Sequence, residues 1–121
     1  MQRSERVGDE IRKIVAGLIQ HEIKDPRLPA LTSVTEVSVT RDLSHATIYV
    51  SVMGEEKEQK DCMAALKSAS GFIRREIGRK IRLRVLPELH FQIDDSIERG
   101  IRMTRLIDET LGDKRKDDQS T

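Results

Sequence analysis

The segment VSVTRDLSHATIYVSV at residues 37–52 limits the possible folds of this chain more than any other feature. Apolar and polar residues alternate on both sides of residues 41–45, which is the pattern of two strands joined by a connection of hairpin length. An antiparallel hairpin excludes an all-parallel sheet. Because each strand has one apolar and one polar face, we expect a sheet that is covered on one side only.

The clearest helix precedes this hairpin. Residues 4–24 place their apolar side chains on one face, with Ser4 as the predicted N-cap and Asp25-Pro26 as the stop. Gly8 and Gly17 each cost about 1 kcal/mol relative to alanine inside a helix. We therefore expect the helix to pack closely against a neighbouring element at both glycines.

A second helical region begins in the mixed-charge run at 55–61 and is interrupted by Ser68-Ala69-Ser70-Gly71. The apolar positions after the interruption drift sideways from those before it. Two shorter helices that meet at a kink explain this pattern better than one straight helix, because glycine and serine pairs are known kink sites. We expect Gly71 to adopt a special backbone conformation there, so that Gly71→Val disturbs the kink.

A third strand and a final helix complete the predicted order. Pro87 opens a strand that extends to Ile93. Residues 95–98 resemble a capping box ahead of a last helix, and residues 112–121 have no apolar side chain and are expected to form a disordered charged tail. The predicted fold is α+β, a single domain over residues 1–111, in the order helix, strand, strand, helix, kink, helix, strand. Its mixed three-stranded sheet has helices on one face, and a C-terminal helix follows.

The composition of the 121 residues excludes several classes of protein. One tyrosine and two phenylalanines are too few for RNA readers that stack bases on exposed rings. The single cysteine, Cys62, excludes an internal disulfide, and its helical core spacing predicts a buried side chain. The first ten residues have no apolar run, and no segment is long enough to span a bilayer. We therefore expect a soluble, cytoplasmic protein with no membrane partner.

Sequence patterns indicate no catalytic or cofactor-binding site. The seven glycines form no phosphate-binding loop, and no serine lies in a GxSxG elbow. Nothing recommends a Ser-His-Asp site assembled from distant residues. His21, His45 and His90 fall in no metal-binding motif, so we interpret them as surface or strand-flanking residues and expect no metal. Asp94-Asp95 is interpreted as a strand end and helix cap rather than a Mg²⁺ site. The prediction is a protein that is not an enzyme and has no cofactor.

Positive charge is concentrated between residues 74 and 84. This segment carries a net charge of +5 in a chain whose total is +1, so the remaining residues sum to −4. Its six basic residues, called the basic cluster below, are Arg74, Arg75, Arg79, Lys80, Arg82 and Arg84. One or two cations are enough to offset a helix dipole, and arginine suits bidentate phosphate binding. We therefore favour contact with nucleic acid over a solvated charged face.

Four basic residues on the first helix have two interpretations. They are Arg3, Arg6, Arg12 and Lys13. They extend the nucleic-acid footprint in one interpretation and are ordinary solvent-facing charges in the other, and both stay open.

The order strand, helix, kink, helix, strand, with basic residues beside the kink, resembles a type II KH domain. In that fold a glycine-containing turn between two helices lets the backbone approach RNA. The usual GxxG is missing here, and Ala69-Ser70-Gly71 stands in its place. Together with IKDPRL at 23–28, the hairpin at 37–52 and RVLPELHFQIDDSIERGIR at 84–102, this variant resembles the ribosome-binding factor A family, whose KH-like domain replaces GxxG by Ala-x-Gly.

The resemblance implies a monomeric, non-enzymatic factor that binds the immature 30S subunit near its neck, in contact with 16S rRNA and with ribosomal proteins there. It implies support of late rRNA folding and end processing, notably in the cold, and departure before translation. The basic cluster would meet rRNA phosphates beside the kink formed by Ala69, Ser70 and Gly71. Two alternatives stay open: a KH-type module for another RNA, and a protein–protein adaptor whose arginines meet an acidic partner.

Overall fold

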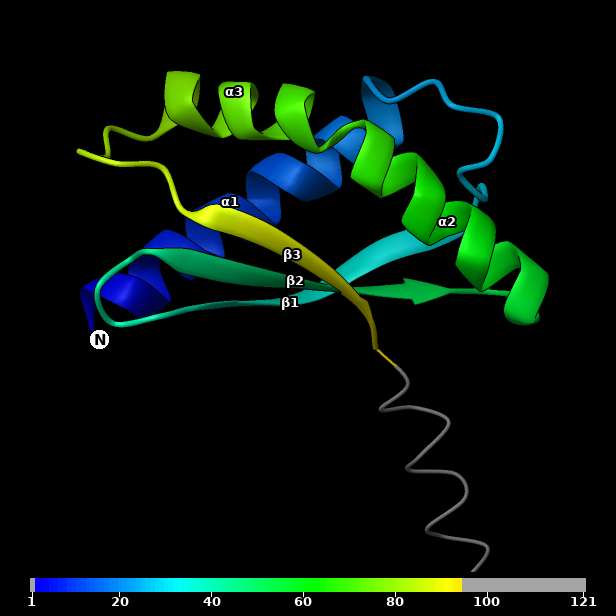
Figure 1. Ribbon diagram of the computed structural model, residues 1–121, viewed down its shortest axis with the longest axis horizontal. Coiled ribbons are helices and arrows are strands. Elements are labelled where there is room, and N and C mark those ends of the chain that lie inside the picture. Colours follow the sequence, from blue (N-terminus) through cyan, green and yellow to red (C-terminus); the bar gives the residue numbers. More distant parts are fainter. Residues whose placement is uncertain (1, 95–121) are drawn as a thin grey trace, which may run out of the picture.

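The computed structural model describes residues 2–94, which form a three-stranded sheet with three helices on one of its faces (Figure 1). The strands are β1 (Thr32–Val39), β2 (His45–Val52) and β3 (Glu88–Ile93), and they lie in the order β1-β2-β3. The helices are α1 (Arg3–His21), α2 (Glu56–Ser68) and α3 (Ser70–Lys80). β1 pairs with β2 antiparallel, and β2 pairs with β3 parallel. The predicted α+β class, mixed sheet and one-sided covering are confirmed.

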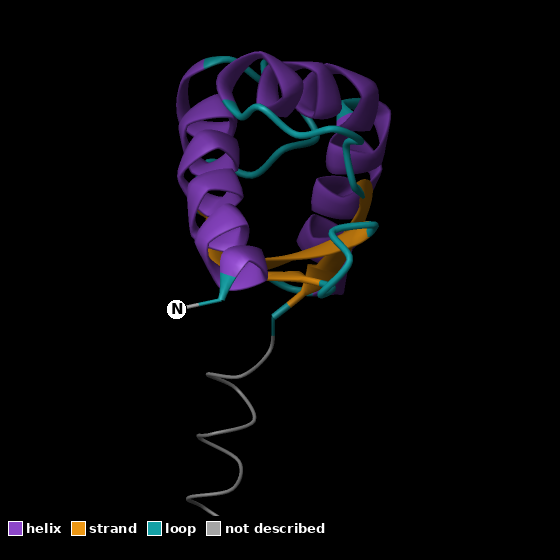
Figure 2. Ribbon diagram, turned by 90° about the vertical axis from the view of Figure 1, so that its left-hand side faces the viewer, coloured by secondary structure: helices purple, strands orange, loops and turns teal. Residues whose placement is uncertain are grey.

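The core lies between the helices and the apolar face of the sheet (Figure 2). Every second residue of β2 is buried, and Ala46, Ile48 and Val50 have no exposed surface. Ile11 and Val15 of α1 belong to the same buried cluster. Full burial of each large apolar side chain stabilises the fold by about 1.5–3 kcal/mol relative to leaving it in water. The alternation of β2 therefore determines which side of the sheet the helices cover.

α1 approaches β1 closely at Gly8. A Cβ atom added there would lie 2.9 Å from the carbonyl oxygen of Val37, which is backbone and cannot easily move. At Gly17 an added Cβ would meet nothing within 4 Å. The predicted close packing is confirmed at Gly8 and is wrong at Gly17, which lies in the same helix but faces open space.

The break between α2 and α3 lies at Ala69. Its φ of −89° and ψ of 0° lie at the edge of the helical region. The Ala69 N–H donates to the Ala65 carbonyl, and the Ile73 N–H donates to the Ala69 carbonyl at 2.9 Å. The two helices therefore change direction with little loss of hydrogen bonding, and the predicted kink is confirmed (Figure 1).

Gly71 does not have the special conformation that we expected. It is the second residue of α3, and the only glycine with a positive φ among the described residues is Gly54. A Cβ atom added at Gly71 would meet nothing within 4 Å. The expectation that the kink requires glycine here is wrong, because the change of direction is made before Gly71, at Ala69.

Five boundaries differ from the predicted ones. α1 ends at His21 rather than at residue 24, and β3 begins at Glu88 rather than at Pro87. β1 begins at Thr32 rather than near residue 37, because a bulge between Val34 and Glu36 interrupts the alternation that would reveal a strand. α1 begins at Arg3, so Ser4 lies buried inside the helix and is not its cap. His45, expected in the connection, is the first residue of β2.

The remaining predictions fall beyond the described part of the chain. The capping box at 95–98, the C-terminal helix and the tail at 112–121 lie outside the described residues. Within residues 2–94, no helix combines the length and the apolar character needed to cross a membrane.

Candidate nucleic-acid interface

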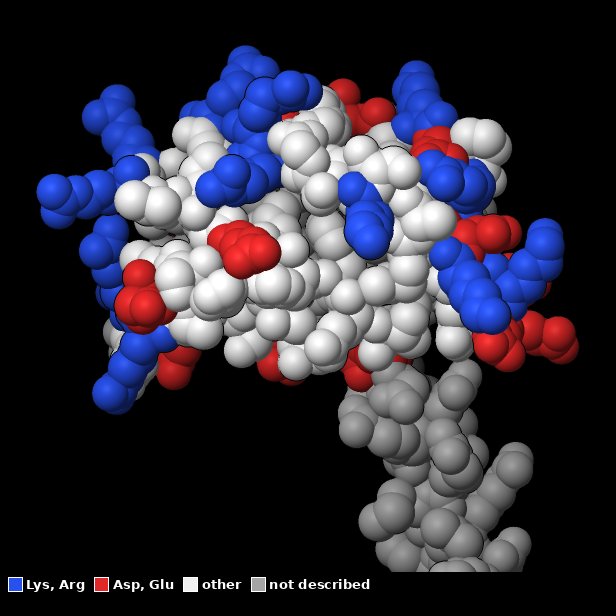
Figure 3. Space-filling model, in the orientation of Figure 1, with Lys and Arg blue, Asp and Glu red and all other residues white. Residues whose placement is uncertain are grey.

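The basic cluster occupies α3 and the segment that follows it. Every member of the cluster is exposed. Figure 3 shows Lys and Arg gathered above α3 and at the end of the molecule beyond it, whereas basic and acidic side chains are mixed around α2. The structure therefore brings the six predicted residues to one region of the surface.

Local packing explains why the cluster faces outward. Ile73 and Ile77 of α3 are buried, which fixes that face of the helix against the core. Ile81, the residue that ends the helix, is also buried, while Arg82 and Arg84 are exposed on either side of a half-buried leucine. Each apolar anchor thus turns the neighbouring basic side chains toward solvent.

Few internal groups neutralise these charges. Arg79 forms an ion pair with Glu76 at 3.0 Å, and Arg74 Nη2 donates to the Leu86 carbonyl at 3.2 Å. The side chains of the other four members have no ion-pair or hydrogen-bond partner among residues 2–94. An exposed ion pair such as that of Arg79 contributes about 1 kcal/mol or less, so a phosphate can displace it.

Of the basic residues on α1, Lys13 lines a hollow together with a member of the basic cluster. Lys13 and Lys80 line one hollow between α1 and α3, together with His21 and the acidic Glu22. Arg3 and Arg6 are exposed at the start of α1, which lies at the same end of the molecule as the end of α3 (Figure 1), and Arg12 is half-buried. The positive surface of α3 therefore continues onto α1 at Lys13.

A groove that the sequence did not reveal runs between the α2–α3 break and β3. Two adjoining hollows form it, and both are lined by Ser70 and Leu89. α2 contributes Lys67 to the first hollow, while Gly71 and Arg74 line the second. β3 is last in the strand order, so its outer edge has no strand partner within the described residues. The second hollow is also lined by Glu88, so the groove combines two cations and one carboxylate with an open strand edge, and its wall at Gly71 carries no side chain.

Sequence reasoning missed this groove for a specific reason. The position of β3 depends on its parallel pairing with β2, and no local pattern in residues 88–93 encodes a partner so distant in the chain. Lys67 in the last turn of α2 has the ordinary pattern of a residue that offsets the helix dipole. Only the fold places it across from β3.

The loop between α1 and β1 is tied to the kink by Arg27. Its guanidinium pairs with the Asp25 carboxylate at 2.6 Å and donates to Ser68 Oγ at 3.1 Å. The hydrogen bonds from Arg27 hold the pKa of Asp25 below its ordinary value. Asp25 and Arg27 thus anchor the IKDPRL loop to the last residue of α2, directly before the break.

Cys62, His45 and His90 lie outside the basic cluster. Cys62 is fully buried, and burial raises the pKa of its thiol, so the predicted buried side chain is confirmed. His45 and His90, which the sequence separates, lie on the paired strands β2 and β3 with ring nitrogens 3.0 Å apart.

Comparison with known proteins agrees with the fold. The family model described as ribosome-binding factor A matches residues 3–107. Ribosome-binding factor A of Acetivibrio thermocellus is 53% identical over 123 residues and covers 100% of both chains, and that of Clostridium botulinum strain Loch Maree is 46% identical over 115 residues, covering 95% of this chain and 96% of its own.

Solved structures that resemble this chain are also of ribosome-binding factor A. The crystal structure of ribosome-binding factor A from Thermus thermophilus superposes with a TM-score of 0.65 at 29% identity, over 74% of this chain and 94% of that one. A homology model of the Thermus thermophilus protein, fitted into the cryo-EM map of its complex with the 30S subunit, gives a TM-score of 0.63 at 28% identity, over 76% of this chain and 96% of that one. On the family match and the near-complete coverage of these relatives, the chain belongs to the ribosome-binding factor A family.

Proposed function

We propose that this protein binds the 30S small ribosomal subunit and that the basic cluster is its main contact with rRNA. The observation that carries the proposal is six exposed cations on and after α3, of which four lack an internal partner among the described residues. The relative fitted into a 30S complex supports the choice of partner. Arginine forks match phosphate oxygens in pairs, so an RNA backbone is the polyanion that such a surface fits best.

The groove beside the kink adds a second contact in this proposal. Lys67 and Arg74 attract a backbone phosphate, and the bare wall at Gly71 lets the RNA chain come close. Lys13 extends the positive surface toward α1. Arg3, Arg6 and Arg12 belong to the same proposed footprint, at its edge.

We further propose a role in late 30S maturation, including the folding and end processing of 16S rRNA and notably at low temperature. In this proposal the protein acts in the cytoplasm as a monomer without catalysis, and the matching family is described by ribosome binding rather than by a reaction. Its effect on rRNA comes from binding: a ligand shifts a conformational equilibrium only by its difference in affinity for the two states. The protein therefore binds the immature conformation more tightly than the mature one and leaves when folding is complete.

The test is co-sedimentation of Arg74→Glu/Arg75→Glu with purified 30S subunits. Two lost charge-assisted contacts at roughly 1.5 kcal/mol each predict an affinity lower by about a hundredfold. Both side chains are exposed, so the fold should survive. Lys57→Glu/Lys60→Glu is the matched control, because it makes the same change of charge at exposed positions of α2 and should leave binding within a few-fold.

Equal sedimentation of both double variants with the wild type would show that α3 is not the contact face. Equal losses in the two would show that binding follows net charge alone. A loss that appears with an acidic protein partner but not with rRNA fragments would favour the adaptor.

A further inference from the structure

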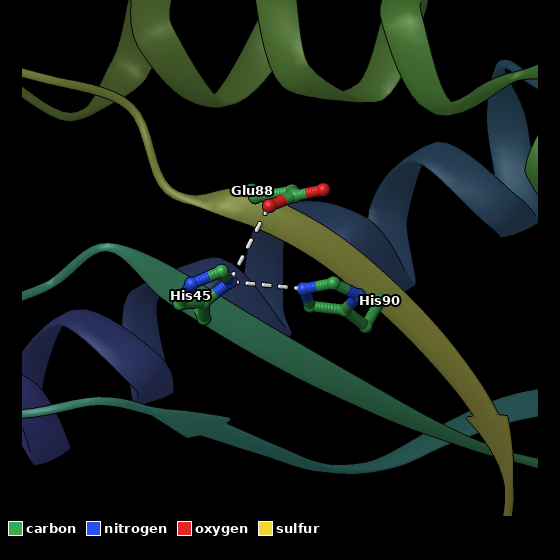
Figure 4. A group of neighbouring side chains, drawn as sticks. All are labelled: His45, Glu88 and His90. Atoms are coloured by element: carbon green, nitrogen blue, oxygen red, sulfur yellow. Dashed lines mark hydrogen bonds and ion pairs between the residues drawn. The ribbon is translucent and has the colours of Figure 1, made fainter.

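The polar face of the sheet holds a cluster of three possible metal ligands. The parallel register places His45 of β2 opposite Glu88 of β3, and His90 lies two residues further along β3 on the same face. All three side chains are exposed. Figure 4 shows the two imidazoles and the carboxylate converging from the neighbouring strands.

The donor atoms already lie at distances close to those of a metal site. His45 Nδ1 is 3.0 Å from His90 Nε2 and 3.5 Å from Glu88 Oε2, and all three donor atoms lie within 4.8 Å of one another. Tetrahedral zinc, with bonds of about 2.0–2.1 Å, separates its ligand atoms by roughly 3.3 Å. The two shorter distances lie on either side of this value. The third distance, between the donor atoms of His90 and Glu88, can shorten by rotation of the Glu88 side chain, which is 69% exposed and has room to turn.

The chemistry of the three ligands selects the ion. Imidazole nitrogen favours zinc, nickel and copper, whereas magnesium and calcium require oxygen ligands. We propose that His45, Glu88 and His90 bind one divalent transition-metal ion, with zinc as the best match. Three protein ligands leave a fourth position open toward solvent, which water or another donor can fill.

Bound metal would link two strands that are joined by a long connection. β3 lies at an edge of the sheet, and its pairing with β2 is parallel. Because the site exists only when the two strands are paired, metal binding stabilises the folded state by mass action. A rise in the melting temperature with added metal is therefore expected.

The test is calorimetric titration of the untagged full chain with zinc chloride. The wild type should bind one zinc ion per chain, and His45→Ala and His90→Ala should each weaken binding by about tenfold or more. Glu88→Gln, which keeps the shape and removes the charge, should also weaken it. His21→Ala is the matched control, since His21 is exposed on α1 and lies outside the cluster.

Far-UV circular dichroism of each variant establishes that the fold is retained, as expected for exposed side chains. The absence of zinc binding by the wild type would overturn the proposal. So would unchanged affinity in any of the three cluster variants, or an equal loss in His21→Ala. The titration uses the isolated protein, so its outcome is independent of 30S binding.

Discussion

Three hydrogen bonds converge on the carboxylate of Asp42 in the connection between β1 and β2. Ser44 Oγ donates at 2.7 Å, Thr40 Oγ1 at 2.8 Å and the Ser44 N–H at 3.1 Å. These bonds favour the ionised form and lower the pKa of Asp42 from 3.8 to about 2. The connection between β1 and β2 is thus stabilised by a carboxylate whose pKa lies below its ordinary value.

This arrangement predicts how the hairpin responds to acid. Because the folded pKa lies below the ordinary one, the stabilisation is fully present above about pH 4 and is lost as the pH falls toward 2. The Asp42 carboxyl carbon should therefore titrate in NMR spectra with a midpoint of about 2. Thr40→Val removes one donor and should raise the midpoint. A midpoint of 3.8 in the unaltered protein would show that the bonds do not form in solution.

Substitution of Gly71 should affect the stability of the fold and the affinity for the 30S subunit in opposite directions. It lies in the first turn of α3 in open space, so Gly71→Ala should raise the free energy of unfolding by about 0.5 kcal/mol. The same methyl group projects beside the groove, so 30S affinity should fall. Denaturant unfolding and co-sedimentation measure the two effects. A loss of stability would show that Gly71 does have a special backbone conformation. Unchanged affinity for the 30S subunit would show that Gly71 is not part of the contact surface.

Among the helices, α1 contains two glycines at which substitution by alanine should change the stability of the protein in opposite directions. Gly8→Ala forces a Cβ atom against the Val37 carbonyl, and overpacking of this kind costs about 1–3 kcal/mol. Gly17→Ala meets nothing, so it should stabilise the protein by about 0.5–1 kcal/mol through helix propensity. Chemical denaturation of the two variants should show shifts of opposite sign. Shifts of the same sign would mean that α1 does not pack on β1 as described.

Elements whose pattern is local were predictable from the sequence. The alternation in β2 and the sideways drift of the apolar positions around Ala69 each depend on near neighbours in the chain, and both were confirmed. The start of β1 was missed because a bulge breaks the period on which strand recognition depends. The role of Gly71 was misjudged because the segment contains several residues of low helix propensity, and the sequence does not show at which residue the helix changes direction.

At the scale of the whole molecule, what escaped prediction depends on pairing between distant segments. The parallel pairing of β2 with β3 creates both the groove opposite α2 and the His45–Glu88–His90 cluster. The basic cluster was identified because its six residues are close in sequence, and burial of Ile73, Ile77 and Ile81 turns them outward. A candidate site was thus predictable where it is continuous in the chain and not where two strands assemble it.

If the exposed cations of α3 and its following segment meet RNA phosphates, binding to the 30S subunit must weaken as salt is added. Six phosphate contacts predict a slope of log affinity against log salt of about −4 to −5, and loss of two contacts in Arg74→Glu/Arg75→Glu should make the slope shallower by about 1 to 1.5. We expect this shallower slope in the α3 variant and an unchanged slope in Lys57→Glu/Lys60→Glu. A flat salt response, or identical slopes for the wild type and the α3 variant, would contradict it.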